Sequence, residues 1–258
     1  MQEKTRLTGA EIIWATLEGE GVREVFGYPG GAILPAYDAL RKFPIRHILV
    51  RHEQSAVHMA DGYARASGRT GVAIATSGPG ATNMVTGIAT AMLDSIPLVC
   101  ITGQVGSKVL GSDAFQEVDI TGITLPVTKH NYVVTRAEDV APVLRDAFRV
   151  AISGRPGPVL IDLPIDVQMA EIEFDIDTYE TLPVYKPTAS RKQAERALAM
   201  LNASDRPLIV AGGGIINADA SAQLVEFAEL RMSWLTVALE KPPSLNDPVV
   251  LNSSLVVG

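Results

Sequence analysis

One carboxylate stands where a strand is expected to give way to a helix. Glu53 follows the apolar run Ile45 to Val50, and after it small apolar residues recur at spacings of three and four until Gly68, a typical C-terminal cap. The positive end of a helix dipole favours the ionised carboxylate, whereas burial favours the neutral acid. Glu53 is therefore a candidate for proton chemistry. The alternative is an ordinary acidic first turn, which is common in helices.

Two glycine-rich turns are the other stretches that could hold a ligand. The turn Gly27 to Gly31 follows an expected strand at Val22 to Phe26, and the turn Ser77 to Asn83 follows another at Gly71 to Thr76. Glycine lets a backbone approach a neighbour closely or adopt positive φ. Each turn therefore suits a bound molecule, although a tight turn without a ligand has the same composition.

The order of elements predicts an α/β fold with a parallel sheet covered by helices on both faces. Strand, turn and helix alternate along the chain, and connections of this length are typical of right-handed crossovers. Ligands in such sheets lie beyond the carboxyl ends of the strands, where Glu53 and both glycine turns fall. The other expected elements of this domain are helices at Thr8 to Gly19, Ile33 to Phe43, Met84 to Leu93 and Ala137 to Ser153, and strands at Pro97 to Thr102 and Pro158 to Leu163.

The chain divides into a large first domain and a shorter second part. We expect a first α/β domain at 1–169, a linker at 170–189, the start of a second α/β domain at 190–230 and an atypical tail at 231–258. One βα unit cannot enclose a core, so the second domain is expected to be incomplete. Its expected elements are a helix at Ser190 to Leu201, a strand at Leu208 to Ala211, a turn at Gly212 to Gly214, a helix at Asp219 to Leu230 and a strand at Trp234 to Leu239.

Composition excludes several classes of partner. The 258 residues carry a net charge of -7, and the pI is near 5.2, which argues against nucleic acid and anionic membranes. Cys100 lies in an apolar run and is expected to be an inert buried thiol. His52 and His58 have no partners at metal-ligand spacing, so no metal site is predicted. Without a signal peptide or membrane span, a cytoplasmic protein is expected.

Several motifs together resemble the N-terminal part of the acetolactate synthase large subunit, a thiamine-diphosphate enzyme. The resemblance runs from about Leu7 to Ile172, whereas Glu171 to Asp219 is more similar to glyoxylate carboligase of the same superfamily. The motifs are Gly27-Tyr28-Pro29-Gly30-Gly31-Ala32, Arg51-His52-Glu53, Met59-Ala60-Asp61-Gly62-Tyr63-Ala64-Arg65, Ser77-Gly78-Pro79-Gly80-Ala81-Thr82-Asn83, Ile101-Thr102-Gly103-Gln104 and Asp113-Ala114-Phe115-Gln116-Glu117.

The resemblance implies that 1–169 is the pyrimidine-binding domain of a thiamine-diphosphate enzyme and that 190–230 begins its central domain. It also implies a role for each matching residue. Glu53 matches the glutamate that hydrogen-bonds a ring nitrogen of the cofactor's aminopyrimidine and favours the tautomer that removes the thiazolium proton. Gly31 matches a glycine whose backbone approaches the cofactor and the developing oxyanion, although a tight turn alone is the alternative. The implied catalytic residues are Glu53, Gly31 and Gln116. The implied cofactor-binding residues are Glu53, Pro29, Gly30, Gly31, Thr76, Gly80 and Asn83.

Four further residues match the substrate channel of the family: Ala32, Gly106, Phe115 and Gln116. Gly106 stands where acetolactate synthases commonly have proline, which leaves the shape of the channel to be decided. For Phe115, ordinary packing is an equal alternative. A flavin is weakly indicated by Gly212 to Gly214.

The implied activity is decarboxylation of pyruvate and transfer of the two-carbon unit to a second 2-keto acid. Glyoxylate carboligases generally carry an apolar residue where Glu53 stands, so pyruvate is favoured over glyoxylate. The family signature that holds Mg²⁺ and the diphosphate has no match here, so the chain is expected to be a truncated member, inactive alone and homodimeric. The alternative is a non-catalytic dimerising or binding module. Ester hydrolysis is disfavoured because no Gly-x-Ser-x-Gly elbow is present.

Overall fold

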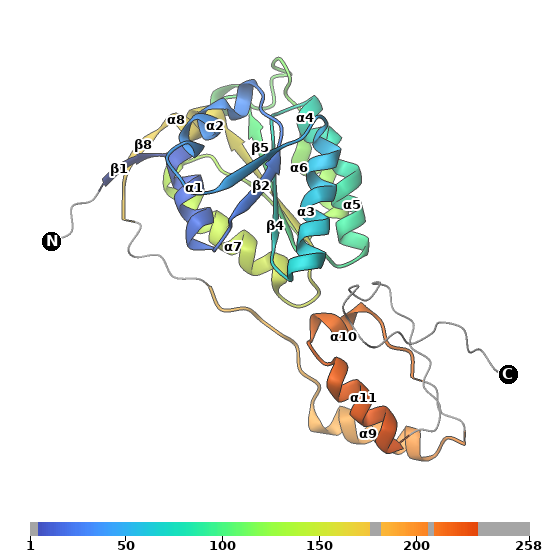
Figure 1. The fold of residues 1–258 in the computed structure, drawn as a ribbon. Helices are drawn as coiled ribbons and strands as arrows, with labels where there is room; N and C mark the ends of the chain where they lie inside the picture. The colour runs from blue at the N-terminus through green and yellow to red at the C-terminus, as the bar shows by residue number, and fades with distance from the viewer. Residues whose placement is uncertain (1–4, 176–181, 206–208, 232–258) are drawn as a thin grey trace. The chain divides into compact units, whose positions relative to one another are not determined.

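The structure is a computed structural model that describes residues 5–175, 182–205 and 209–231 (Figure 1). The chain forms two compact units, Met1–Lys186 and Pro187–Gly258. No helix among the described residues is long and apolar enough to cross a membrane.

The first unit is built on a six-stranded parallel sheet with the order β3-β2-β4-β5-β7-β6 (Figure 1). Every pairing in this sheet is parallel, so the expected parallel α/β sheet is confirmed. The strands are β2 (Glu24–Gly27), β3 (Arg46–Leu49), β4 (Gly71–Ala75), β5 (Leu98–Gln104), β6 (His130–Val133) and β7 (Pro158–Pro164).

Helices cover both faces of the sheet. The three central strands, β4, β5 and β7, are therefore buried along their whole length. One face packs against α1 (Gly9–Gly19), α2 (Leu34–Leu40) and α7 (Val140–Ile152), with Trp14 fully buried in its core. The other face packs against α3 (Glu53–Ser67) and α5 (Val85–Leu93) (Figure 1). Gly68 ends α3 with φ of 70°, as its C-cap position predicts.

Two short strands lie outside the large sheet and were not predicted. β1 (Thr5–Thr8) pairs antiparallel with β8 (Glu171–Phe174). The expected linker at 170–189 therefore begins with a strand, and near its end Tyr185 O accepts a hydrogen bond of 2.8 Å from Gly154 N. Glu171-Ile172-Glu173-Phe174 alternates polar and apolar residues, which is the strand signal that the acidic and proline-rich composition concealed.

The turns and loops around the carboxyl ends of the strands are more helical than expected. Residues within the turn Ser77 to Asn83 form α4 (Pro79–Asn83), and the irregular stretch Gly103 to Leu125 contains α6 (Ile120–Thr124). The expected helix at Ile33 to Phe43 is a 3-10 turn at Gly31–Ile33 followed by α2. A short helix after β7, α8 (Ile165–Met169), and β6 were also not predicted.

The described part of the second unit is helical. It holds α9 (Arg191–Asn202), α10 (Gly213–Asn217) and α11 (Ser221–Arg231). The strand expected at Leu208 to Ala211 is wrong for its described residues, Ile209 to Ala211, and the glycine turn that follows it opens α10 instead. The strand expected at Trp234 to Leu239 and residues 232–258 of the tail lie outside the described residues.

Candidate active site

Glu53 begins α3 at the carboxyl edge of the sheet, as the sequence predicted. Its side chain is buried, with the residue 9% exposed. His52 precedes it as the N-cap, and its Nδ1 accepts a hydrogen bond of 3.2 Å from the backbone N–H of Gln54. The local role of His52 is therefore structural, and the helix start is fixed independently of the Glu53 carboxylate. That carboxylate is left to interact with the other turns at this edge.

The second glycine turn brings an amide to Glu53. Asn83, the last residue of α4, donates a hydrogen bond of 2.9 Å from Nδ2 to Oε2 of Glu53. Close approach depends on Gly80, where a Cβ atom would lie 3.2 Å from Oε1 of Glu53 and only 2.7 Å from Cγ2 of Thr76. Residues 53, 76, 80 and 83 are therefore one constellation, which the structure brings together from three segments.

The first glycine turn is tied to the same strand end. Oγ1 of Thr76 accepts a hydrogen bond of 3.2 Å from the N–H of Ala32, and a Cβ atom on Gly30 would lie 2.5 Å from Cγ2 of Thr76. Gln168, from α8, donates a hydrogen bond of 2.8 Å to Ala32 O. Gln168 was not predicted, because its partner Ala32 lies 136 residues away along the chain.

Gly31 differs from Gly30 in its surroundings. A Cβ atom on Gly31 would meet nothing within 4 Å, and its φ is not in the positive range that requires glycine. Neither crowding nor a positive φ therefore requires glycine at position 31. Gly31 is exposed, so the space beside its backbone is open to solvent. Pro29, two residues earlier, is half-buried in the same turn.

The stretch after β5 reaches the same edge of the sheet. A Cβ atom on Gly78, which has φ of 53°, would lie 2.5 Å from Gln116 O, so this loop packs directly on the turn before α4. Phe115 is 87% exposed, so ordinary packing within this chain is wrong for its side chain. The structure thus places Gln116 next to the second glycine turn and Phe115 at the surface.

Gly106 has a backbone that proline can adopt. Its φ of -57° and ψ of 143° match proline's fixed φ, and a Cβ atom there would lie 3.9 Å from Oδ1 of Asp166. Glycine at this position therefore leaves the local chain path unchanged. The departure from the family's proline changes the stiffness of the loop.

Comparisons with known proteins match this arrangement of elements. The family model "Thiamine pyrophosphate enzyme, N-terminal TPP binding domain" matches residues 7–123, and "Thiamine pyrophosphate enzyme, central domain" matches residues 194–242. These two stretches of the chain therefore belong to the N-terminal and central domains of thiamine pyrophosphate enzymes. The match to the central domain continues past Leu230, so the similarity extends into the expected tail at 231–258.

Curated relatives carry names of the same family. The chain is 55% identical over 227 residues to "Acetolactate synthase large subunit" of Corynebacterium glutamicum, covering 87% of this chain and 36% of the relative. It is 51% identical over 242 residues to "Acetolactate synthase isozyme 1 large subunit" of Escherichia coli, covering 93% of this chain and 43% of the relative. It is 57% identical over 227 residues to "Glyoxylate carboligase" of Escherichia coli, covering 87% and 38%. The chain thus spans well under half the length of these relatives.

The residues present fit the pyrimidine side of the cofactor that defines the thiamine pyrophosphate enzymes. A buried carboxylate held by one amide, a glycine packed against that carboxylate and open space at Gly31 suit a planar ring with a protonatable nitrogen. Among the described residues, no group of three or more His, Cys, Asp or Glu side chains could hold a metal ion.

Tyr37, on α2, and His47, on β3, form a pair that the sequence analysis did not single out. Their rings form an edge-to-face pair, and the Tyr37 hydroxyl lies 3.1 Å from Nε2 of His47. Burial, assisted by the nearby charge of Glu53, raises the pKa of Tyr37, which therefore stays neutral. Burial also lowers the pKa of His47. Tyr37 and His47 are thus two neutral aromatic side chains, of which Tyr37 lies close enough to Glu53 to respond to its charge.

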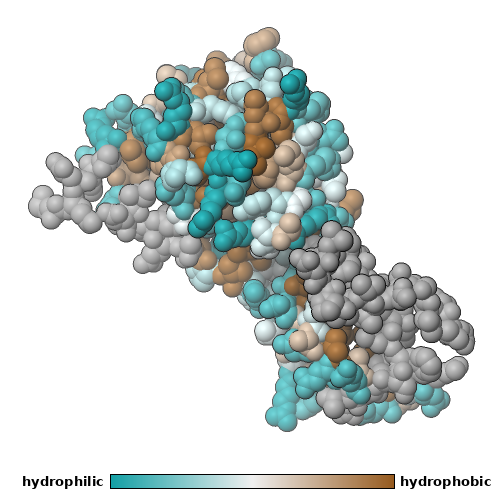
Figure 2. Space-filling model, viewed as in Figure 1, coloured by the Kyte–Doolittle hydropathy of each residue, from teal (hydrophilic) through white to brown (hydrophobic). Residues whose placement is uncertain are grey.

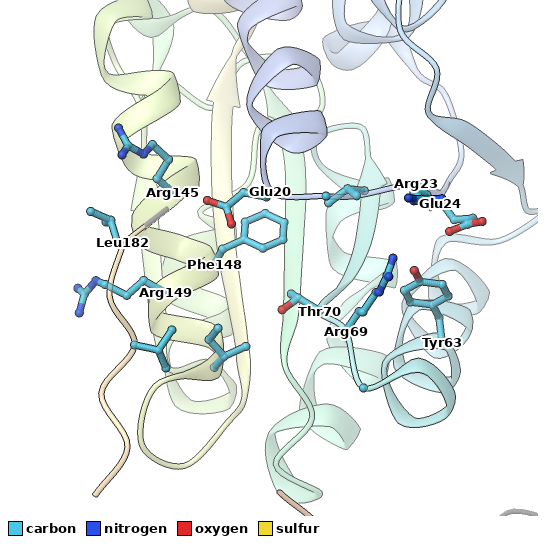
Figure 3. Close-up of a pocket in the computed structure, with 15 residues that line it drawn as sticks. Glu20, Arg23, Glu24, Tyr63, Arg69, Thr70, Arg145, Phe148, Arg149 and Leu182 are labelled. Carbon is cyan, nitrogen blue, oxygen red and sulfur yellow. The ribbon is translucent and has the colours of Figure 1, made fainter. Parts of the chain in front are cut away.

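A cavity of about 480 Å³ lies at the opposite, amino edge of the sheet (Figure 3). Phe148 stands on one side, and Tyr63 and Arg69 stand on the other. Residues near the ends of α1, α3 and α7 line it, and cationic side chains are favourable where helix carbonyls converge. Arg149 lies in the last turn of α7 and has this structural explanation. The lining residues do not include any residue of the Glu53 constellation. The charged lining residues are Glu20, Arg23, Glu24, Arg69, Arg145 and Arg149.

Proposed function

We propose that this chain supplies the cofactor-activating half of a thiamine-diphosphate-dependent carboligase of the acetolactate synthase type. One observation carries the proposal: the buried Glu53 carboxylate is held by Asn83 and packed on Gly80, beside open space at Gly31. An acid that only started a helix would need neither the amide nor the close glycine. The family match supplies the class of cofactor.

Each residue of the constellation has a proposed task. When bound, thiamine diphosphate supplies a nucleophilic carbon and an electron sink for decarboxylation of a 2-keto acid. Glu53 holds a proton between its carboxylate and a pyrimidine ring nitrogen, and Asn83 fixes the orientation of that carboxylate. Pro29, Gly30, Gly31, Thr76 and Gly80 form the wall against which the ring lies.

Phe115 and Gln116 are proposed to line the substrate entrance together with Ala32 and Gly106. Gln116 meets the turn that positions Asn83, and the exposed Phe115 ring is free to contact a substrate or another chain. Gln116 and the Gly31 backbone are the proposed polar contacts of the reacting substrate.

Pyruvate is the proposed substrate, with glyoxylate as the second candidate. Two of the cited relatives are named acetolactate synthases, but the glyoxylate carboligase is similar at a comparable level. Glu53 favours pyruvate, because the resemblance implies an apolar residue there in glyoxylate carboligases. A direct comparison of the two substrates is therefore part of the test.

The proposal includes a homodimer and a further cofactor-binding part. We assign none of the described residues to Mg²⁺ or to the diphosphate, so the 258-residue chain is proposed to be inactive alone. Met59 on α3 and Leu93 on α5 are exposed at 42% and 77%, and apolar side chains are interspersed with polar ones on the face shown in Figure 2. These helices are the proposed dimer surface. No flavin is included, because Gly212 to Gly214 only begin a five-residue helix.

Complementation tests the proposal. The chain, the remaining C-terminal portion of the Corynebacterium glutamicum relative, thiamine diphosphate, Mg²⁺ and either pyruvate or glyoxylate are combined, and the carboligation product is quantified. Pyruvate should give acetolactate, the chain alone should give none, and Glu53→Gln should slow acetolactate formation by about 10²–10⁴. Dimers that ignore the cofactor and stay inactive after complementation would support the non-catalytic module instead.

A further inference from the structure

A second buried carboxylate lies near the constellation and has no part in the function proposed so far. Asp162, on β7, is 3% exposed. Its Oδ1 accepts a hydrogen bond of 2.6 Å from Thr102 Oγ1, and its Oδ2 accepts one of 2.9 Å from Gln104 Nε2. Both donors come from the neighbouring strand β5. A buried acid is costly, so a carboxylate kept between two central strands calls for a role that an apolar residue could not fill.

Gln104 connects this carboxylate to the loop that follows β5. Besides its bond to Asp162, Nε2 donates a hydrogen bond of 3.1 Å to Val118 O. Its Oε1 accepts one of 2.9 Å from the backbone N–H of Val105. The Gln104 side chain is therefore hydrogen-bonded to both ends of the 105–118 loop, which we call the fastening of this loop. Asp162 fixes the orientation of the Gln104 side chain.

The loop between these two fastenings carries Phe115 and Gln116. Glu117 closes it by accepting hydrogen bonds from the N–H groups of Gly111 and Ala114. The carbonyl of Gln116 then packs on Gly78, directly before α4. A displacement at Val118 would therefore move Gln116 relative to the turn that carries Asn83.

We propose that Gln104 and Asp162 are positioning residues that set the place of Phe115 and Gln116 at the mouth of the Glu53 site. The role in substrate entry rests on the proposed function, whereas the fastening of the loop does not. Thr102 serves the carboxylate without touching the loop, which provides a matched control. Among the described residues, the charge of Asp119 also acts on Asp162 and disfavours its ionised form.

Hydrogen exchange of the 258-residue chain tests the fastening. Gln104→Met removes both donated bonds at nearly constant volume, and Thr102→Val removes the other bond to the same carboxylate. We expect amides of the 105–118 loop to exchange about tenfold faster in Gln104→Met, with amides of α3 unchanged, because a buried pair loses its donor. Thr102→Val should leave the loop amides unchanged. Equal effects of the two variants, or none in Gln104→Met, would overturn the fastening.

Asp162→Asn separates positioning from simple loss of packing. Its Oδ1 can still accept from Gln104 and its amide can donate to the Thr102 hydroxyl, so loop exchange should stay near the wild-type rate. Asp162→Val, which offers no acceptor, should behave like Gln104→Met. Failure of asparagine to rescue the loop would show that the carboxylate acts through packing alone.

Turnover of the complemented enzyme tests the link to substrate entry. Gln104→Met should raise KM for pyruvate about tenfold with a smaller fall in kcat, because the loop lines the entrance and carries Gln116, whereas Glu53 is untouched. An unchanged KM together with faster loop exchange would overturn the role in entry. If wild-type protein gives no turnover, the proposed function and this role in entry both fail, and the exchange result still decides the fastening.

Discussion

The side-chain amide of Asn83 donates a hydrogen bond of 2.9 Å to the carboxylate of Glu53, across 30 residues of chain. Asn83 is the last residue of α4, and Glu53 is the first residue of α3. The two helices meet only because the strands that precede them lie in one sheet. This pair is the point at which the fold becomes a candidate active site.

Removal of the amide should weaken the reaction without removing it. In the complemented enzyme, Glu53→Gln should lower kcat for acetolactate formation by about 10²–10⁴, the usual contribution of a positioned acid or base. Asn83→Ala should lower it about tenfold, because the carboxylate remains but loses its orientation. In the Glu53→Gln variant, adding Asn83→Ala should lower kcat only a little further. Thr82→Ala, a change at an exposed neighbour, is the control. If the loss of kcat in the double variant equals the product of the two single losses, the two residues act independently.

A methyl group at Gly80 should disturb the constellation directly. Gly80→Ala places a Cβ atom 2.7 Å from Thr76 Cγ2, so the free energy of unfolding should fall by about 1–3 kcal/mol. Gly62→Ala, within α3 and with nothing near its Cβ position, should instead stabilise by about 0.5–1 kcal/mol. Urea unfolding followed by circular dichroism measures both. Similar signs for the two substitutions would contradict the packing described here.

The adjacent glycines of the first turn should respond differently to the same change. Gly30→Ala meets Thr76 at 2.5 Å and should destabilise the fold by about 1–3 kcal/mol. Gly31→Ala meets open space, so stability should change by less than about 0.5 kcal/mol. Activity of the complemented enzyme should nevertheless fall in Gly31→Ala, because that space is proposed to receive the cofactor. Full activity in a stable Gly31→Ala protein would remove Gly31 from the site.

Asp162 should make stability depend on pH. Burial, the largest influence, raises the pKa of Asp162 from 3.8 to about 6, although Thr102 and Gln104 act in the opposite direction. The folded state therefore binds this proton more tightly than the unfolded state, and the associated stability is present below pH 3.8 and lost as pH rises through about 6.

The neutral variant Asp162→Asn lacks this loss. Its advantage in free energy of unfolding over wild type should grow by about 2 kcal/mol between pH 4 and pH 7. Urea titrations at several pH values measure the difference, and Asp146→Asn, at a partly exposed ion pair, is the control because the pKa of Asp146 is lowered. A constant difference between wild type and Asp162→Asn would contradict the raised pKa.

Proline at position 106 should stiffen the loop without changing its path. The φ of -57° at Gly106 suits proline, so Gly106→Pro should stabilise by about 0.4–1 kcal/mol through the unfolded chain. Thermal unfolding measures the gain. Gly111→Pro is the control, because its φ of 80° excludes proline and the change should destabilise. A loss of stability in Gly106→Pro would show that the backbone there is constrained in a further way.

The sequence by itself determined the architecture of the first unit and most of the candidate site. Repeating strand, turn and helix patterns place Glu53 and both glycine turns at one edge, since the carboxyl ends of parallel strands share that edge. It missed β1 and β8, because four-residue strands carry little periodic signal and depend on each other across the whole first unit.

Only the tertiary structure decided which side chains meet. The bond between Asn83 and Glu53, the hold of Gln168 on Ala32 and the fastening of Gln104 to Asp162 join residues 30, 136 and 58 positions apart. Local patterns cannot encode such pairs, because a hydrogen bond depends on distance and angle between groups that the fold brings together. The same reason explains why Gly30 and Gly31 differ although they are identical residue types. Thr76 packs beside Gly30, and only this packing shows that Gly31 is the position with open space.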